Sequence, residues 1–111
     1  MAIVGKQLGQ LRPADTNAAS LYSPPASTAA RLTQLFVCNQ TAGPESFRVF
    51  CDDDGTTYSE ATALYYDVAI AANVTTAIDL AIYMNDATGN LAVRSSTNSA
   101  LTFTLFGIET S

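Results

Sequence analysis

The stretch TTAIDLAIYM, residues 75–84, alternates apolar side chains with small or polar ones. Ile78, Leu80, Ile82 and Met84 occupy every second position, and alanine, aspartate and tyrosine fill the positions between them. Successive side chains of a β-strand point to opposite faces of a sheet, so a period of two indicates a strand with one buried face. We therefore predict that this stretch is a strand of a half-buried sheet.

The same alternation recurs along the chain, with turn-forming residues between the apolar runs. Clusters rich in Gly, Pro, Asn, Asp, Ser and Thr lie at 40–46, 52–57, 71–76, 85–90 and 96–100. Short strands at such spacing predict an all-β, single-domain antiparallel β-sandwich or a small barrel. The residues expected on the buried faces are Leu64, Tyr66, Val68 and Ile70, then Phe47, Val49 and Cys51, and finally Leu101, Phe103 and Leu105.

The N-terminal residues have two interpretations. Residues 1–19 form either an extended arm that reaches a neighbouring subunit or a first strand and loop of the same sandwich. Residues 20–111 are expected to form the β-sandwich domain. Within it, Leu21 and Tyr22 precede two prolines, which cannot donate a backbone hydrogen bond, so we predict a short edge strand there.

The charge of the chain limits its partners. Ten Asp and Glu against five Lys and Arg give a net charge of −5, and the five cations are scattered along the sequence. Nucleic acids and anionic membranes require clustered cations, so we expect neither as a partner. No apolar run approaches the length of a bilayer span, and the N-terminus lacks the features of a signal peptide. We therefore expect synthesis in the cytoplasm without a cleaved export signal.

The side chains that most often support catalysis are scarce. The chain contains no histidine, so a Ser-His-Asp triad, a histidine general base and a histidine-bound metal are all excluded. Its two cysteines cannot complete a zinc site alone. We therefore expect no enzymatic activity, no cofactor and no metal.

The most charged stretch, FCDDDGTTYSE (50–60), has some features of a cation-binding loop. Aligned on Gly55, an EF-hand loop would place its first ligand on Phe50 and its closing glutamate on Ala61, so the pattern fails at both ends. Adjacent carboxylates on a strand also point in alternating directions. We predict a turn in which Gly55 supplies a positive φ and an aspartate caps the backbone, with a calcium site as the alternative.

Cys38 and Cys51 lie on two segments, 32–39 and 46–51, that we expect to form a β-hairpin. One register places the cysteines opposite each other and permits a disulfide. A shift of one residue moves every side chain to the other face, so only one register is possible. We favour the register that leaves both thiols reduced and builds a core from Leu35, Val37, Phe47, Val49 and Cys51.

Several large side chains fall on the strand faces opposite the expected core. Either the second sheet or a loop covers them, or they anchor an interface with another subunit. The candidate interface residues are Phe36, Cys38, Phe50, Tyr65, Tyr83 and Phe106.

The order of these segments resembles a family of small structural proteins of tailed bacteriophages. The segments are KQLGQLRPADT, SLYSPPAST, LFVCNQT with ESFRVFCDDDG, LYYDVAIAANVTT and NLAVRSSTNSALTFTLFGIE, which together cover nearly all of the chain. The most telling are residues 21–28, the run from Asp67 to Thr75, and the run from Leu101 to Glu109. The chain departs from the family in its DDDG turn and in its cysteines.

This resemblance implies a β-sandwich or jelly-roll fold and a role in virion assembly. The implied protein is a capsid decoration (cement) protein, often a homotrimer, that binds the major capsid protein on the outer surface of the head and stabilises the shell. It would be made in the bacterial host cytoplasm and reside in the virion. A tail, baseplate or fibre component is the alternative. A glycan-binding module is a second alternative, in which tyrosines stack on sugars.

Overall fold

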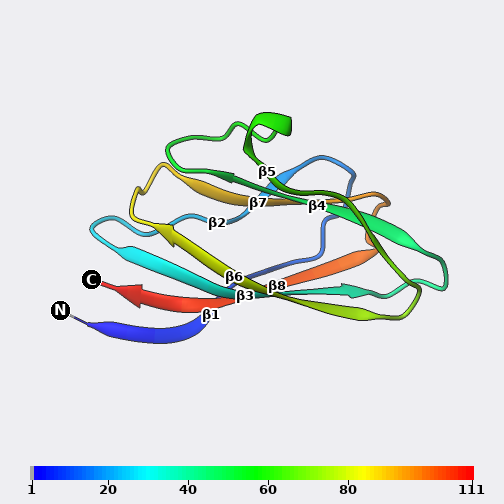
Figure 1. Cartoon of the computed structure of the whole chain (residues 1–111), viewed down its shortest axis with the longest axis horizontal. Coiled ribbons are helices and arrows are strands. Elements are labelled where there is room, and N and C mark those ends of the chain that lie inside the picture. The colour runs from blue at the N-terminus through cyan, green and yellow to red at the C-terminus, as the bar shows by residue number, and fades with distance from the viewer. Residues whose placement is uncertain (1) are drawn as a thin grey trace.

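The computed structural model describes residues 2–111, which form two antiparallel β-sheets packed face to face (Figure 1). The first sheet has the strand order β1-β8-β3-β6, and the second has the order β2-β7-β4-β5. A short 3-10 helix, η1 (Glu60–Thr62), precedes β5. The strands are β1 (Ile3–Leu11), β2 (Ala19–Tyr22), β3 (Ala29–Asn39), β4 (Glu45–Asp52), β5 (Ala63–Ile70), β6 (Thr75–Met84), β7 (Asn90–Ser95) and β8 (Leu101–Thr110).

The chain crosses from one sheet to the other at every connection except the one between β4 and β5. Two four-stranded sheets linked in this way form a jelly-roll sandwich. The predicted all-β antiparallel sandwich is therefore confirmed, with eight strands in the residues that the structure describes.

The core lies between the two sheets and is built from the alternating residues of the central strands. Phe47 of β4 and Phe103 of β8 meet there edge to face, with ring centroids 6.3 Å apart. The predicted inner faces of β4, β6 and β8 are confirmed, since Ile78, Leu80 and Ile82 pack against this core. Its fully buried members include Leu32, Leu35, Val37, Phe47, Val49, Leu91, Val93, Leu101, Phe103 and Leu105.

The predicted hairpin between residues 32–39 and 46–51 is wrong, because β3 and β4 belong to different sheets. Asn39, only 1% exposed, holds the crossing in place. Its amide nitrogen donates to the carbonyl oxygens of Gly43 (3.0 Å), Ile70 (3.2 Å) and Ala71 (3.1 Å). Both cysteines are free: Cys38 lies on the outer face of the first sheet, and Cys51 packs against the core from the second.

The predicted alternation of residues 63–70 is wrong in its first half. Phe47 of β4 is opposite Val68, but Val49 is opposite Tyr65, so β5 carries an extra residue in between. Such a bulge reverses the faces that follow it. Asp67 adopts the left-handed φ of 51° within the bulge. As a result, Tyr65 packs against the core, and Leu64 and Tyr66 are exposed.

The acidic turn is organised by Asp52. Its carboxylate accepts hydrogen bonds from the backbone N–H groups of Asp54 (3.3 Å) and Thr57 (2.8 Å). These bonds hold the pKa of Asp52 below its ordinary value. The prediction of a positive φ at Gly55 is wrong. Glycine has another role there: a Cβ atom on Gly55 would lie 3.0 Å from Oδ2 of Asp52 and would crowd the carboxylate that organises the turn.

The N-terminal segment runs along the first sheet. β1 pairs with β8 from Ile3 opposite Thr110 to Leu11 opposite Phe103, with one irregularity between Gln7 and Gly9. β1 is thus one edge strand of the first sheet, and β6 is the other. Among residues 2–111, no helix is long and apolar enough to cross a membrane.

Candidate interaction surface

The side of the first sheet that points away from the core is a regular surface formed by long paired strands. We call it the outer face of the first sheet, and it forms the lower side of the lower layer in Figure 1. We define it by the outward residues of three of its four strands. They are Arg31, Gln34, Phe36 and Cys38 of β3, Ala77, Asp79, Ala81 and Tyr83 of β6, and Thr102, Thr104, Phe106 and Ile108 of β8.

This face carries little charge for the surface of a protein with net charge −5. Among the residues named above, Arg31 and Asp79 are the only charged ones, and Asp79 accepts a hydrogen bond from the Gln34 amide (3.2 Å). At its centre Phe36 and Phe106 meet edge to face, with ring centroids 5.7 Å apart and ring planes at 88°. The face can therefore be buried with little desolvation of charge, which is typical of the core of a protein interface.

The opposite side of the molecule, the outer side of the second sheet, is different. The segment between β4 and β5, including η1, lies over it (Figure 1). Phe50 is only 2% exposed because Tyr58 packs on it, with ring centroids 6.3 Å apart. This side also carries charge: Arg48 forms an ion pair with Asp67 (2.6 Å) and stacks on the ring of Tyr66 (3.9 Å from its centroid).

The six residues predicted as interface candidates are thus divided by the fold. Phe36, Cys38, Tyr83 and Phe106 lie together on the outer face of the first sheet, where Tyr83 is 69% exposed and Phe106 36% exposed. Phe50 lies on the second sheet, covered by the chain itself. Tyr65 was predicted to point away from the core, but the bulge in β5 turns its side chain toward the core.

Sequence reasoning missed other members of this face. Thr102, Thr104 and Ile108 alternate with the buried residues of β8, so the same period of two assigns them to the outer side. Arg31 could not be placed in this way because the register of β3 shifts between Leu32 and Gln34.

The edges of the two sheets differ as well. In the second sheet, β2 is short and precedes Pro24 and Pro25, and β5 carries the charged bulge at Asp67, so both edges are unsuited to further pairing. In the first sheet, β1 and β6 are long. On β1, Ile3 and Val4 are exposed. The first sheet therefore offers both a face and edges to another chain.

One cluster of ionisable groups lies at the open end of the sandwich, around Glu109. Its carboxylate binds Nζ of Lys6 (2.8 Å) and accepts a hydrogen bond from the Tyr22 hydroxyl (2.6 Å). These contacts lower the pKa of Glu109, and burial raises the pKa of Tyr22. The Glu109 carboxylate of β8 thus binds one partner on β1 and one on β2, so the cluster joins these three strands. Among residues 2–111, no three His, Cys, Asp or Glu side chains are grouped so that they could hold a metal ion.

Comparison with known proteins identifies similar folds. No protein-family model matches the chain, and no curated protein matches its sequence. A chain in the structure of infectious bursal disease virus, Gx strain, matches with a TM-score of 0.52 and 10% identity, over 97% of this chain and 36% of that one. The coat protein dimer of Tobacco streak virus matches with a TM-score of 0.50 and 8% identity, over 99% of this chain and 84% of that one. The similarity is one of fold, and this chain spans about a third of the bursal disease virus chain.

Proposed function

We propose that this chain is a structural protein of a bacteriophage virion, a capsid decoration (cement) protein that binds the outer surface of the head as an oligomer and stabilises the shell. The observation that carries the proposal is the outer face of the first sheet, a nearly uncharged surface centred on Phe36 and Phe106. The jelly-roll fold, which a viral coat protein shares, and the resemblance to small phage structural proteins support it.

The mechanism we propose is mechanical. Homotrimers bind the major capsid protein on an expanded head and bury apolar surface that the undecorated shell leaves exposed. Phe36 and Phe106, at the centre of the outer face, anchor the contact between subunits, and the end of the face at Tyr83 stays open to the capsid protein. Large rigid side chains suit this role because they contribute most of the binding energy at protein interfaces. Each contact is modest, but a subunit that engages several sites at once binds far more tightly than any one contact allows.

The proposal is tested by adding the purified protein to expanded heads that lack it. We expect saturation at regularly spaced sites on the outer surface, with a copy number comparable to that of the major capsid protein, and heads that withstand a higher temperature. Quantitative mass spectrometry and electron cryo-microscopy measure both copy number and position.

Two other outcomes would contradict it. Binding confined to the tail, at a far lower copy number, would identify a tail, baseplate or fibre component. Binding to an array of glycans without binding to heads would identify a sugar-binding module.

A further inference from the structure

Arg31 differs from the other cations of the chain. Four of the five Lys and Arg side chains bind a partner within the chain: Lys6 binds Glu109 (2.8 Å), Arg12 donates to the carbonyl oxygen of Ser99 (3.0 Å), Arg48 binds Asp67 (2.6 Å) and Arg94 donates to the carbonyl oxygen of Thr16 (2.8 Å). Within residues 2–111 the guanidinium of Arg31 forms no hydrogen bond and no ion pair. The guanidinium instead lies 5.8 Å from the centroid of the Tyr83 ring.

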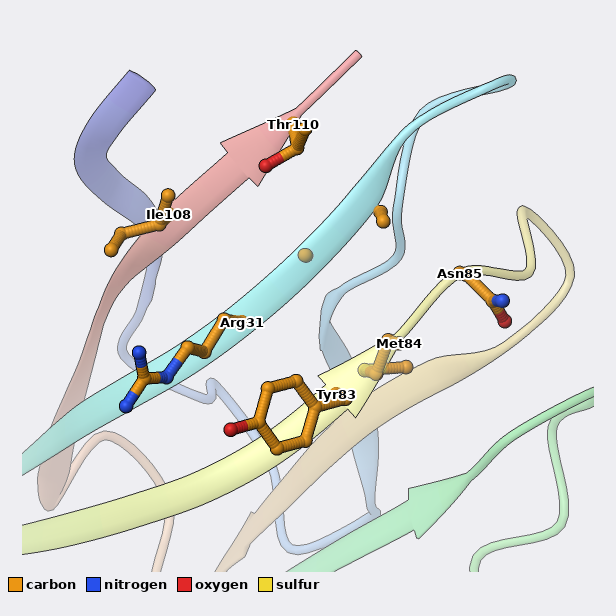
Figure 2. Close-up of a pocket in the computed structure, with 8 residues that line it drawn as sticks. Arg31, Tyr83, Met84, Asn85, Ile108 and Thr110 are labelled. Atoms are coloured by element: carbon orange, nitrogen blue, oxygen red, sulfur yellow. The ribbon is translucent and has the colours of Figure 1, made fainter. Parts of the chain in front are cut away.

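Arg31 also lines a hollow of about 490 Å³ at one end of the outer face of the first sheet. Ile108, Arg31 and Tyr83 lie side by side on β8, β3 and β6, and Figure 2 shows the Tyr83 hydroxyl beside the guanidinium. Asn85, which follows the last residue of β6, and Thr110 complete the polar part of the lining. Met84 and Ile108 supply apolar atoms.

The lining of this hollow is suited to an anion. It contains no carboxylate, although the chain as a whole has a net charge of −5. Besides the guanidinium, it offers the hydroxyls of Tyr83 and Thr110 and the amide of Asn85. Two acidic residues adjoin the lining. Glu109, opposite Ala30, has its oxygens bound to Lys6 and Tyr22, and Asp86, which follows Asn85, accepts hydrogen bonds from the backbone N–H and the hydroxyl of Thr88. An anion in the hollow thus meets donors, and the carboxylates beside the lining already have partners.

We propose that this hollow binds the carboxylate of an acidic side chain, Asp or Glu, presented by an extended segment of the capsid protein on which the chain docks. The inference rests on the proposed function and names the chemistry of the partner. A guanidinium donates two parallel N–H groups to a carboxylate, which fixes the orientation of the bound group as well as attracting it. Ile108, beside Arg31 on β8, would receive the aliphatic part of the segment.

Two features favour a protein segment over an acidic sugar. First, Tyr83 and Met84 are the last residues of β6, an edge strand of the first sheet, so an extended segment can lie alongside this strand. Second, the Tyr83 ring already stacks against Arg31, which leaves it less available as a platform for a sugar.

The direct test uses nuclear magnetic resonance titration of the purified chain with two blocked peptides, acetyl-Leu-Glu-Leu-amide and acetyl-Leu-Gln-Leu-amide. We expect the glutamate peptide to shift amide signals of Arg31, Tyr83, Asn85 and Thr110 with a dissociation constant of about 1 mM. The glutamine peptide, which has the same shape without the charge, is expected to bind about tenfold more weakly.

Two variants separate the hollow from general charge effects. Arg31→Gln is expected to weaken binding of the glutamate peptide about tenfold. Arg12→Gln, which makes the same change in charge outside the hollow, is expected to leave it unchanged. Equal binding of the two peptides, no shifts in the hollow, or equal losses in both variants would overturn the proposal. Titration with N-acetylneuraminic acid or inorganic phosphate is a further arm: binding of either one in the hollow, without binding of the glutamate peptide, would assign the site to that anion instead.

Head binding then distinguishes this inference from the function on which it rests. If wild-type protein binds heads and Arg31→Gln binds them equally well, the inference is wrong and the proposed function stands. If the glutamate peptide binds as expected but wild-type protein does not bind heads, the carboxylate site stands and the proposed capsid partner is wrong. Weaker head binding by Arg31→Gln alone supports both.

Discussion

Asn39 is the side chain on which the path of the chain depends most. It is buried, it donates to three carbonyl oxygens, and its own oxygen accepts from the backbone N–H of Thr41 (2.9 Å). We expect Asn39→Ala to lower the free energy of unfolding by roughly 2–4 kcal/mol, because each buried polar group left unpaired costs about 1–3 kcal/mol. Urea denaturation measures this. Asn98→Ala, at an exposed position, is the control, and equal stability of the two variants would contradict this role of Asn39.

Glu109 makes the stability of the fold depend on pH. Its contacts with Lys6 and Tyr22 lower its pKa from 4.5 in the folded state. A carboxyl group with a lowered folded pKa contributes stability above its unfolded pKa, and this contribution is lost as the pH falls through the folded pKa. We therefore expect Glu109→Gln to be less stable than wild type at pH 7, and the difference to shrink steadily below about pH 4.5.

Urea denaturation at pH 7, 4 and 3 tests this expectation. Glu60→Gln, a change at an exposed position on η1, is the matched control. A difference between wild type and Glu109→Gln that stays constant across this range would show that the contacts of Glu109 do not contribute through its charge.

The roles of such single residues were the hardest part to predict. Asn39 lies in a segment, NQTAGP, that predicts a turn between neighbouring strands, and nothing local shows that its amide reaches the end of β5. Gly55 illustrates the same limit, since its lack of a side chain matters because of the Asp52 carboxylate and not because of its own φ. In both cases the deciding partner is defined only once the chain is folded.

Individual strands were predictable where the hydrophobic period runs without interruption. β6 and β8 alternate over their whole lengths, so their inner faces could be assigned from the sequence. The inner face of β5 could not be assigned in this way. Its bulge reverses which side chains point to the core, and no feature of the local sequence marks the bulge. The pairing of β3 also escaped prediction: neighbours in sequence suggest a hairpin, whereas in the jelly roll β3 pairs with β6 and β8.

The bulge of β5 gives a direct test of this explanation. Asp67 has a φ of 51°, a conformation that asparagine tolerates and that a β-branched residue strongly disfavours. The substitutions Asp67→Asn and Asp67→Val both remove the negative charge that pairs with Arg48. Asp67→Asn keeps a residue that tolerates the positive φ, whereas Asp67→Val introduces one that does not. We expect Asp67→Val to be the less stable variant by about 1–2 kcal/mol, because the left-handed conformation costs an L-residue about that much and valine lacks the local hydrogen bonding by which asparagine offsets it. Thermal and urea denaturation measure the difference.

Equal stability of these two variants would mean that the backbone at position 67 can leave its positive φ without loss of stability, and would contradict this role of the bulge. Circular dichroism in the aromatic region is a second readout, since the bulge decides whether Tyr65 or Tyr66 packs against the core. A change in that signal in Asp67→Val, with no change in Asp67→Asn, is expected.

At the level of the whole molecule, part of the candidate surface followed from the sequence and part did not. The period of two places Phe36, Cys38, Tyr83 and Phe106 on the strand faces that point away from the core, and the fold collects them on one face. The hollow around Arg31 was not foreseen, because it needs residues from β3, β6 and β8 in a register that shifts at Leu32. A surface shared by three strands depends on topology, which the pattern of one strand does not contain.

The contrast between the two sheets predicts which one carries self-association. Phe106→Arg places a charge at the centre of the nearly uncharged outer face of the first sheet. Leu64→Arg makes a comparable change on the second sheet, at a side chain that is more exposed (48%) than Phe106 (36%). Both sites can accept the arginine without loss of the core, so each variant is expected to fold. Only the first should disturb an interface, because burying an unpaired charge there is strongly unfavourable.

Light scattering coupled to size exclusion, at two protein concentrations, measures the effect. We expect wild type and Leu64→Arg to have a mass near three times the 11.7 kDa of one chain, and Phe106→Arg to have the mass of a monomer. If Leu64→Arg dissociates and Phe106→Arg does not, the subunits meet through the second sheet, and the outer face of the first sheet remains available for the capsid. If wild type is itself a clean monomer at both concentrations, the trimer is wrong, and the apolar face is covered only when the protein binds the head.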